Sequence, residues 1–202
     1  EAGGLPEPDV FKLTYSSPSM GLDNKWELYT HHSEPIAAIS IRGTSANDES
    51  WLANFYSAMI PARGTLQLSD SAIFNYSFSN HPQAAIHSGW AISVLSLSED
   101  ILYKIDSLYK KGIHQFFITG HSQGGAISTL LTAYLQQLQL QGRLSKNIIL
   151  KNYASASPKP GNEYFSHDFK LKNETYGAFN VVNVDDWVPQ TFLTVQRVED
   201  YP

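Results

Sequence analysis

The 202-residue sequence has no cysteine, few charged residues and no long apolar run. Without cysteine, disulfides and thiolate zinc sites are excluded. Only 16% of the residues are charged, against the usual ~25%. The 14 lysines and arginines form no basic run and the net charge is −5, which disfavours nucleic-acid binding. No apolar stretch approaches the roughly 18 residues that span a bilayer, so no transmembrane segment is predicted.

The chain reads as one domain, because its length suits a single domain and no repeat, low-complexity tract or change of composition divides it. It begins with Glu1 and shows no signal peptide. We therefore expect either a mature secreted or periplasmic form, or a segment of a longer protein. No pair of histidines has convincing metal-ligand spacing, and the sequence implies no metal and no cofactor.

Apolar runs and helical periodicities alternate along the chain. Residues 36–41 form a nearly continuous apolar run between Pro35 and Gly43, which predicts a buried strand. Apolar residues recur at steps of three or four over 90–108 and 127–138, which predicts two amphipathic helices. We further expect strands at 26–30, 72–78, 115–119, 147–153 and 178–184, a short helix at 48–57, and an irregular stretch over the first 25 residues. This alternation favours an α/β fold with a mostly parallel central sheet and helices on both faces.

The sharpest local pattern is Gly-x-Ser-x-Gly at residues 120–124, between the predicted strand and the second helix. So tight a turn forces Ser122 into a strained conformation and brings backbones close together, where Gly120 and Gly124 have no Cβ to clash. The Ser122 hydroxyl is then exposed at the start of a helix, and the N–H of Gln123 points to the same spot. The pattern predicts a nucleophile with half of an oxyanion hole. A glycine-rich turn with an ordinary serine is the alternative.

A second loop follows the buried strand, with the sequence Arg42-Gly43-Thr44. Loops at the carboxyl ends of neighbouring parallel strands lie close together, so this loop is expected beside the Gly-x-Ser-x-Gly turn. A hydroxyl and a backbone N–H there could complete the oxyanion hole with Gln123. On the residues alone, however, Thr44 fits an ordinary turn residue better.

A serine nucleophile needs a base, and the base needs an orienting carboxylate. In α/β-hydrolases the chain order is serine, then acid, then histidine. Asp185 and Asp186 follow an apolar run and one of them is the natural acid, but no histidine comes after Asp186. The seven histidines are His31, His32, His81, His87, His114, His121 and His167. We expect none of them to be the base; His87, for example, is expected to fix a loop.

Five segments match the motifs of one family in the right order. They are Arg42-Gly43-Thr44, Ile86-His87-Ser88-Gly89-Trp90, the stretch 120–126, Ser157-Pro158-Lys159-Pro160-Gly161-Asn162, and the stretch 182–189. They resemble the class 3 lipases, the fungal-type triacylglycerol lipases and their bacterial relatives. Lys159 stands where that family has arginine. Together the five segments cover residues 40 to 190 and are far more specific than the serine turn alone.

The resemblance implies a role for each matching residue. Ser122 would be the nucleophile, and Asp186, rather than Asp185, the acid. Thr44 would bind the oxyanion through its hydroxyl and backbone N–H, with the N–H of Gln123 as its partner.

The resemblance also implies that residues 45–60 form a lid, since the family's lid follows the oxyanion loop. An apolar lid face could cover a pocket and then turn toward lipid. The apolar residues of this region are Trp51, Leu52, Phe55, Tyr56, Met59 and Ile60. A packed surface helix is the alternative.

We therefore expect an α/β-hydrolase that cleaves acylglycerol or other lipid esters through an acyl-enzyme, with transient contact to a lipid interface. Because the family's histidine lies after the segment that ends at Pro189, we expect this single domain, residues 1–202, to lack its C-terminal segment. A non-catalytic lipase-like binding module is the first alternative. A peptidase or acyltransferase on the same fold is the second.

Overall fold

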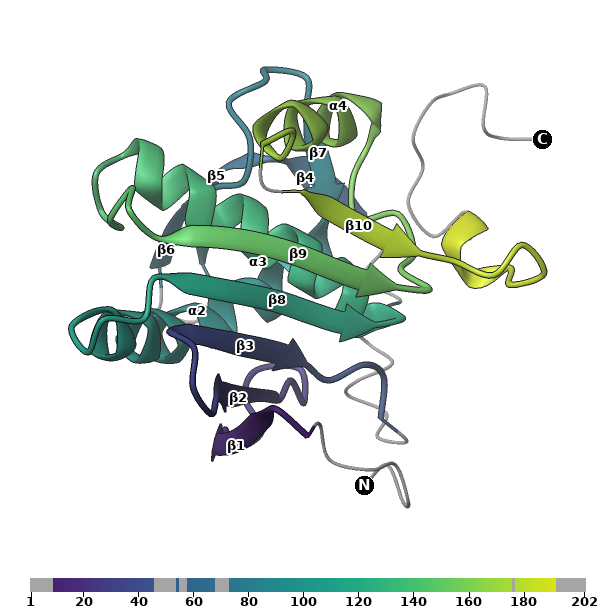
Figure 1. The fold of residues 1–202 in the computed structure, drawn as a ribbon. Helices are drawn as coiled ribbons and strands as arrows, with labels where there is room; N and C mark the ends of the chain where they lie inside the picture. The colour runs from purple at the N-terminus through teal and green to yellow at the C-terminus, as the bar shows by residue number, and fades with distance from the viewer. Residues whose placement is uncertain (1–8, 46–53, 55–57, 68–72, 176, 192–202) are drawn as a thin grey trace.

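A six-stranded sheet in the order β1-β2-β3-β8-β9-β10 forms the centre of the molecule (Figure 1). The computed structural model describes residues 9–45, 54, 58–67, 73–175 and 177–191. The strands are β1 (Phe11–Ser16), β2 (Trp26–His31), β3 (Ile36–Ile41), β8 (Gln115–His121), β9 (Ile149–Ser155) and β10 (Ala178–Val181). The last four strands of the sheet order run parallel, and β1 and β2 join them antiparallel. The mostly parallel sheet expected from the sequence is therefore confirmed.

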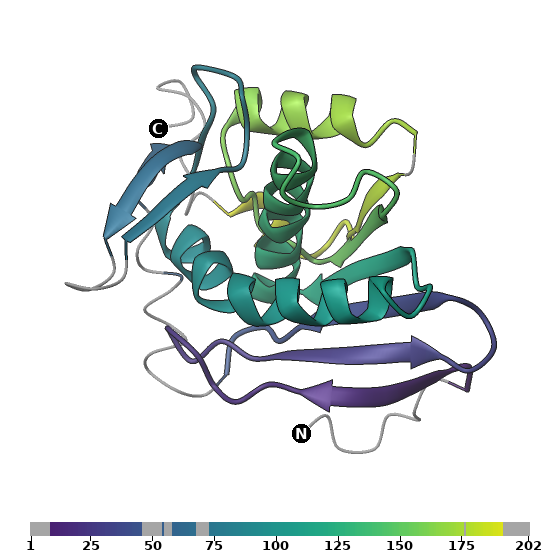
Figure 2. The same ribbon diagram turned by 90° about the vertical axis from the view of Figure 1, so that its left-hand side faces the viewer.

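The two longest helices, α2 (Ser88–Tyr109) and α3 (Gln123–Leu140), pack against each other and lie behind the sheet in Figure 1. Turning the molecule shows both on one side of the strands (Figure 2). A third helix, α4 (Glu163–Lys172), and a short 3-10 helix, η1 (Val188–Gln190), follow. The core lies between the sheet and the long helices, and its largest fully buried side chains include Trp26, Trp90, Phe116, Ile39, Leu97 and Ile118.

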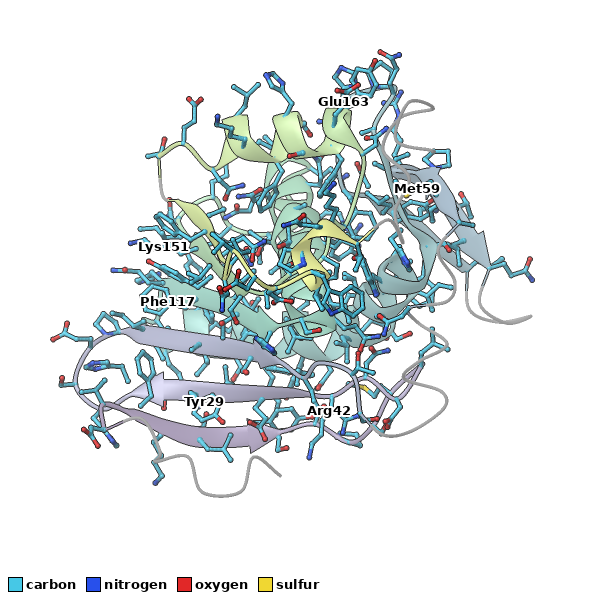
Figure 3. The ribbon with its side chains drawn as sticks, turned by 90° about the vertical axis from the view of Figure 1, so that its right-hand side faces the viewer. Tyr29, Arg42, Met59, Phe117, Lys151 and Glu163 are labelled. Atoms are coloured by element: carbon cyan, nitrogen blue, oxygen red, sulfur yellow. The ribbon has the colours of Figure 1, made fainter. Side chains whose placement is uncertain are left out.

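Two small antiparallel pairs lie beside the main sheet. Strand β4 (Met59–Pro61) pairs with β7 (Ala85–His87), and β5 (Arg63–Gln67) pairs with β6 (Ile73–Ser77). Figure 3 shows Met59 on this side structure. Met59 and Ile60, which the sequence assigned to the lid, are thus the first residues of a paired strand.

The elements expected from the sequence are largely confirmed, but β4, β5, β7 and α4 were not expected and three expectations need comment. The first 25 residues are not simply irregular, since they contain β1. The strand expected at 178–184 ends at Val181, because Asn183 begins a turn in which its side chain accepts the N–H of Asp185 and its carbonyl accepts the N–H of Asp186. The predicted helix at 48–57 lies outside the described residues except for Asn54.

None of the helices in the described part of the chain is long and apolar enough to cross a membrane.

The parallel strands place four loops at one edge of the sheet, because parallel strands end on the same side. Thr44 follows β3, Ser122 follows β8, the stretch 156–161 follows β9, and Asp186 follows β10. The residues that the sequence singled out therefore share this carboxyl edge.

Candidate active site

Ser122 sits in the turn between β8 and α3 with φ 56° and ψ −125°. Such a backbone conformation costs about 1–3 kcal/mol and persists only where neighbours hold it. Its N–H donates to the Ser155 carbonyl at 2.9 Å, and its carbonyl accepts the N–H of Gly125 at 2.9 Å. Serine in this N-cap position usually caps the helix with its hydroxyl, but the Ser122 side chain makes no capping bond. The half-buried Ser122 thus lies at the positive end of the α3 dipole, and its hydroxyl does not cap the helix.

The two glycines of the turn are required by direct backbone contact. A Cβ on Gly120 would lie 2.2 Å from the Gly124 carbonyl oxygen, and a Cβ on Gly124 would lie 2.3 Å from the Ile41 carbonyl oxygen. Gly43 is similarly tight, since its Cβ would lie 2.8 Å from the His121 carbonyl oxygen. These contacts press the loop after β3 directly against the serine turn. Gln123, whose N–H is the expected oxyanion donor, is buried behind Ser122.

The hydroxyl of Thr44 is held by a residue that sequence reasoning missed. Asn54 donates from Nδ2 to Thr44 Oγ1 at 3.1 Å, and its Oδ1 accepts the indole N–H of Trp90 at 3.1 Å. Because Thr44 Oγ1 accepts one hydrogen bond from Asn54, its own proton is directed elsewhere. No local sequence pattern predicts the hydrogen bond between Asn54 and Thr44, which are ten residues apart.

Asp23 fixes the same loop from the other side. Its carboxylate accepts the Ser45 hydroxyl at 2.7 Å and pairs with the Arg42 guanidinium at 2.9 Å. Arg42, at the end of β3 in Figure 3, also donates to the Asp23 carbonyl. Hydrogen bonds from Ser19 and Ser45, together with the Arg42 charge, lower the pKa of Asp23 to about 2. Asp23 therefore holds the loop on both sides of Thr44, through Arg42 and Ser45.

We expect Asn54→Ala to lower the free energy of unfolding by about 1–3 kcal/mol, because the fully buried Trp90 loses the acceptor for its indole N–H. Urea denaturation followed by tryptophan fluorescence measures the change. Asn75→Ala is the matched control, since Asn75 is exposed in the β5–β6 pair and, among the described residues, its side chain accepts only from Thr65. Equal stabilities of the two variants would contradict the role given to Asn54.

Asp186 follows β10 in a short, ordered turn. Its N–H donates to the Asn183 carbonyl at 3.1 Å, and its Oδ1 accepts the N–H of Val188 at 3.0 Å, at the start of η1. Asp186 is half-buried, whereas Asp185 is exposed. Strand β9 separates β10 from β8, so the acid's loop and the serine turn lie two strands apart on the carboxyl edge.

The contacts of the histidines are made with residues other than Ser122 and Asp186. His114 precedes β8 and so lies at the opposite edge of the sheet, and the ring of His121 contacts the Ser155 hydroxyl at 3.0 Å. His81 stacks on Tyr164. Across the described ranges, no histidine hydrogen-bonds to Ser122 or Asp186, and no three His, Asp or Glu side chains form a group that could hold a metal.

His87 is fully buried and caps α2. Its Nδ1 accepts the N–H of Trp90 at 3.4 Å, and its ring stacks on the Trp90 ring with centroids 3.8 Å apart. Within the part of the chain that the structure describes, its Nε2 makes no hydrogen bond. Burial lowers the pKa of His87 to about 4, although the nearby Asn54 backbone acts in the opposite direction. A buried neutral ring with this contact set fits a structural residue.

The lowered pKa of His87 predicts a loss of stability in mild acid. The unfolded chain binds a proton on this ring near pH 6.5, whereas the folded protein does so only near pH 4. The neutral His87 ring therefore makes its full contribution to stability above pH 6.5. The free energy of unfolding falls by up to about 3 kcal/mol as the pH drops to 4. The midpoints of urea denaturation between pH 7 and pH 4 measure this loss of stability. His87→Asn keeps an N-cap acceptor without a titrating ring, so its stability should fall less over this range; an equal fall would contradict the prediction.

Comparison with known proteins identifies the family. The profile of the family "Lipase (class 3)" matches residues 38–196. The chain belongs to the class 3 lipase family. A curated relative, phospholipase A1-Ialpha2 (chloroplastic) of Arabidopsis thaliana, is 29% identical over 157 residues, which are 73% of this chain and 31% of the relative. Secreted mono- and diacylglycerol lipase 1 of Fusarium solani is 33% identical over 76 residues, 38% of this chain and 20% of the relative.

Several solved lipase structures have the same fold as this class 3 lipase. The triacylglyceride lipase of Rhizomucor miehei aligns with a TM-score of 0.62 and 20% identity, over 90% of this chain and 61% of that one. M37 lipase aligns with a TM-score of 0.66 and 22% identity, over 90% of this chain and 56% of that one. The expected α/β-hydrolase fold is thereby confirmed. The chain spans at most about a third of the curated relatives it matches, and about 60% of these structures.

Proposed function

We propose that the protein is a serine carboxylic-ester hydrolase that acts on lipid esters. The observation that carries this proposal is the backbone of Ser122, held at φ 56° at the start of α3 while its hydroxyl is left out of the helix cap. A scaffold has no need of such strain, whereas a nucleophile at this position gains exposure and the positive end of a helix. Membership of the class 3 lipase family supports the same chemistry.

In the proposed reaction, Ser122 Oγ attacks the ester carbonyl and a base takes its proton. The carbonyl oxygen becomes an oxyanion, which accepts hydrogen bonds from the Gln123 N–H and from Thr44. Collapse breaks the bond to the alcohol, which leaves with the proton from the base. Water, deprotonated by the same base, then attacks the acyl-enzyme and releases the carboxylic acid. Asp186 would orient the base.

We propose that the base is a histidine from outside these 202 residues. Of the seven histidines of the chain, His87 is buried in a helix cap and His121 contacts the Ser155 hydroxyl. The serine turn, the Thr44 loop and the Asp186 turn share one edge of the sheet, which supports a joint role for them. The lack of a histidine after Asp186 is all that favours a non-catalytic binding module, and the strained turn speaks against that reading.

Acylglycerols or phospholipid esters are the proposed substrates. The two curated relatives are named as a phospholipase A1 and as a mono- and diacylglycerol lipase, and both names describe attack on glycerolipid esters. The lid assigned to Trp51, Leu52 and Phe55 lies outside the described residues and remains a prediction. Transient contact with a lipid interface and a secreted or periplasmic location also remain predictions. The secreted Fusarium solani relative supports secretion.

Acyl transfer to Ser122 tests this function directly. The protein as its gene encodes it, and this 202-residue chain, would each be incubated with a short p-nitrophenyl ester and digested for mass spectrometry. In the gene's full product we expect an acyl group on the peptide that contains Ser122 and release of fatty acid from emulsified diacylglycerol. The 202-residue chain, in which no histidine is placed to take the Ser122 proton, should acylate far more slowly. Hydrolysis of amide substrates or transfer to alcohols in preference to water would instead favour a peptidase or an acyltransferase. Activity without a Ser122 adduct would refute the proposal.

A further inference from the structure

A cavity of about 640 Å³ lies between α4, the loop after β9 and β10. This volume is within the roughly 300–1,000 Å³ of small-molecule sites. Ser122, Thr44, Gln123 and Asp186 are not among its lining residues. The cavity is nevertheless next to the catalytic edge, because Ser157 in its wall lies against Gly125 of α3 and Pro189 in its wall is three residues beyond Asp186.

The wall of the cavity is mostly apolar and is held rigidly. Its apolar lining includes Pro158, Phe165, Phe169, Ala178, Phe179 and Pro189. The rings of Phe165 and Phe169 stack with centroids 5.9 Å apart. A lining of rings and prolines suits a flexible hydrocarbon chain, which needs area and shape rather than hydrogen bonds.

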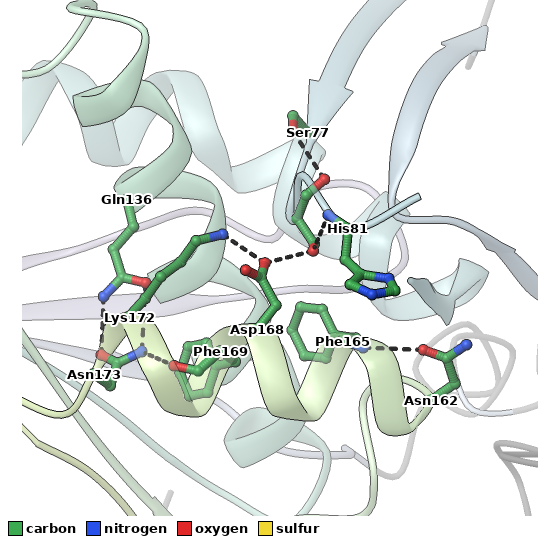
Figure 4. A network of polar contacts seen from close by, with 10 residues as sticks. Ser77, His81, Gln136, Asn162, Phe165, Asp168, Phe169, Lys172 and Asn173 are labelled. Carbon is green, nitrogen blue, oxygen red and sulfur yellow. Dashed lines mark hydrogen bonds and ion pairs between the residues drawn. The ribbon is translucent and has the colours of Figure 1, made fainter. Parts of the chain in front are cut away.

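A polar network fixes α4, which carries the two stacked rings (Figure 4). Asp168 accepts from Ser79, which joins the helix to the loop after β6, and pairs with Lys172 of the same helix. At the other end, Asn173 bonds Gln136 of α3 at 2.9 Å, and at the N-terminus Asn162 accepts the N–H of Phe165 at 3.1 Å. The cavity wall is thus tied to the rest of the fold on both sides.

The charges that line the cavity favour an anion. Among the described lining residues the charged side chains are those of Lys159, Lys170 and Glu174, all exposed, so the lining has two lysines and one carboxylate. This is unusual in a protein with a net charge of −5. The polar wall residues Asn152, Ser157 and Asn173 are buried and already hydrogen-bonded within the protein. They therefore need no polar group of a ligand as a partner.

We propose that this cavity binds a long-chain carboxylate, with the acyl chain against Phe165 and Phe169 and the carboxylate beside Lys170. The proposal rests on the proposed function only for the source of its ligand, because ester hydrolysis at Ser122 releases such an acid nearby. The cavity would act as a second site, separate from the carboxyl edge, that holds the product of the reaction.

Calorimetric titration of decanoate below its micelle concentration tests the proposal, in the Ser122→Ala background so that binding is separated from turnover. Ser166 is exposed, lines the cavity and makes no side-chain hydrogen bond within the described residues. Ser166→Phe should fill the cavity and weaken decanoate binding at least tenfold. His167→Phe adds a similar ring at the next, exposed position, which is not in the lining, and should bind decanoate as the background does.

The head-group assignment has its own test. Lys170→Gln should weaken decanoate binding by up to about fivefold, as expected for an exposed ion pair, and leave decanol binding unchanged. Lys111→Gln, at the exposed end of α2, is the matched control. Equal loss for decanoate and decanol would overturn the carboxylate part. No saturable binding, as when a further polypeptide segment fills the cavity, or full binding by Ser166→Phe, would overturn the proposal. Ester hydrolysis by wild-type protein is measured separately and tests only the proposed function.

Discussion

Ser122→Ala is expected to lower kcat for ester hydrolysis by roughly 10⁵–10⁶ in the form of the protein that holds its base. This size follows from serine-triad enzymes, in which loss of the nucleophile leaves only the rate gained from the oxyanion hole and from binding. In the 202-residue chain alone, the same substitution should change the rate of p-nitrophenyl ester hydrolysis by less than about tenfold, because no histidine is placed to take the Ser122 proton. The hydrolysis rate at pH 8 measures both effects.

Ser33→Ala is the control for this experiment, since Ser33 is exposed in the turn between β2 and β3 at the opposite edge of the sheet. It should leave the rate unchanged in either form. Serine-dependent turnover at ordinary enzyme rates by the 202-residue chain would contradict our placement of the base. It would mean that one of the seven histidines reaches Ser122.

Gly124→Ala should destabilise the fold by at least about 3 kcal/mol, the largest change in stability that we predict. The new methyl carbon would lie 2.3 Å from the Ile41 carbonyl oxygen and 3.0 Å from the Gly43 nitrogen. These are backbone atoms of a central strand and of the loop after it, so they cannot move aside as a flexible side chain would. Urea denaturation measures the free energy of unfolding.

Gly142→Ala separates this contact from the general cost of replacing glycine. Gly142 has φ +72° and nothing within 4 Å of the position where its Cβ would lie. Its replacement should cost about 1–2 kcal/mol, from the left-handed backbone alone. If the two variants were equally stable, the close packing of the serine turn on β3 would be disproved.

The sequence predicted most of the central sheet and both long helices because their signals are local. The apolar run over 36–41 and the periodicity over 90–108 depend only on near neighbours, and β3 and α2 follow them closely. Helix α4 was not predicted because its core-facing apolar residues, Tyr164, Phe165 and Phe169, span only six positions, too few to establish a helical period. Strand β1 escaped because its residues are exposed or half-buried, between a region rich in proline and a turn.

The candidate site divides in the same way. Gly-x-Ser-x-Gly is a local pattern with a mechanical cause, so Ser122 and its glycines could be named from the sequence. Asn54 and Asp23 act on the Thr44 loop through side-chain hydrogen bonds across 10 and 22 residues, and no spacing rule predicts such pairings. The base could not be found because the chain holds no histidine in the expected position.

The contact of Gly124 with Ile41 also bears on when the site appears during folding. It joins backbones about 80 residues apart, and the pairing of β3 with β8 spans a similar distance. Closing so long a loop costs chain entropy before the stabilising contacts form. Such parallel pairings are therefore expected late in folding. A nascent chain that has not completed β8 therefore has neither a strained serine nor an oxyanion loop beside it. Any acylation of Ser122 would accordingly report that β3 and β8 have paired.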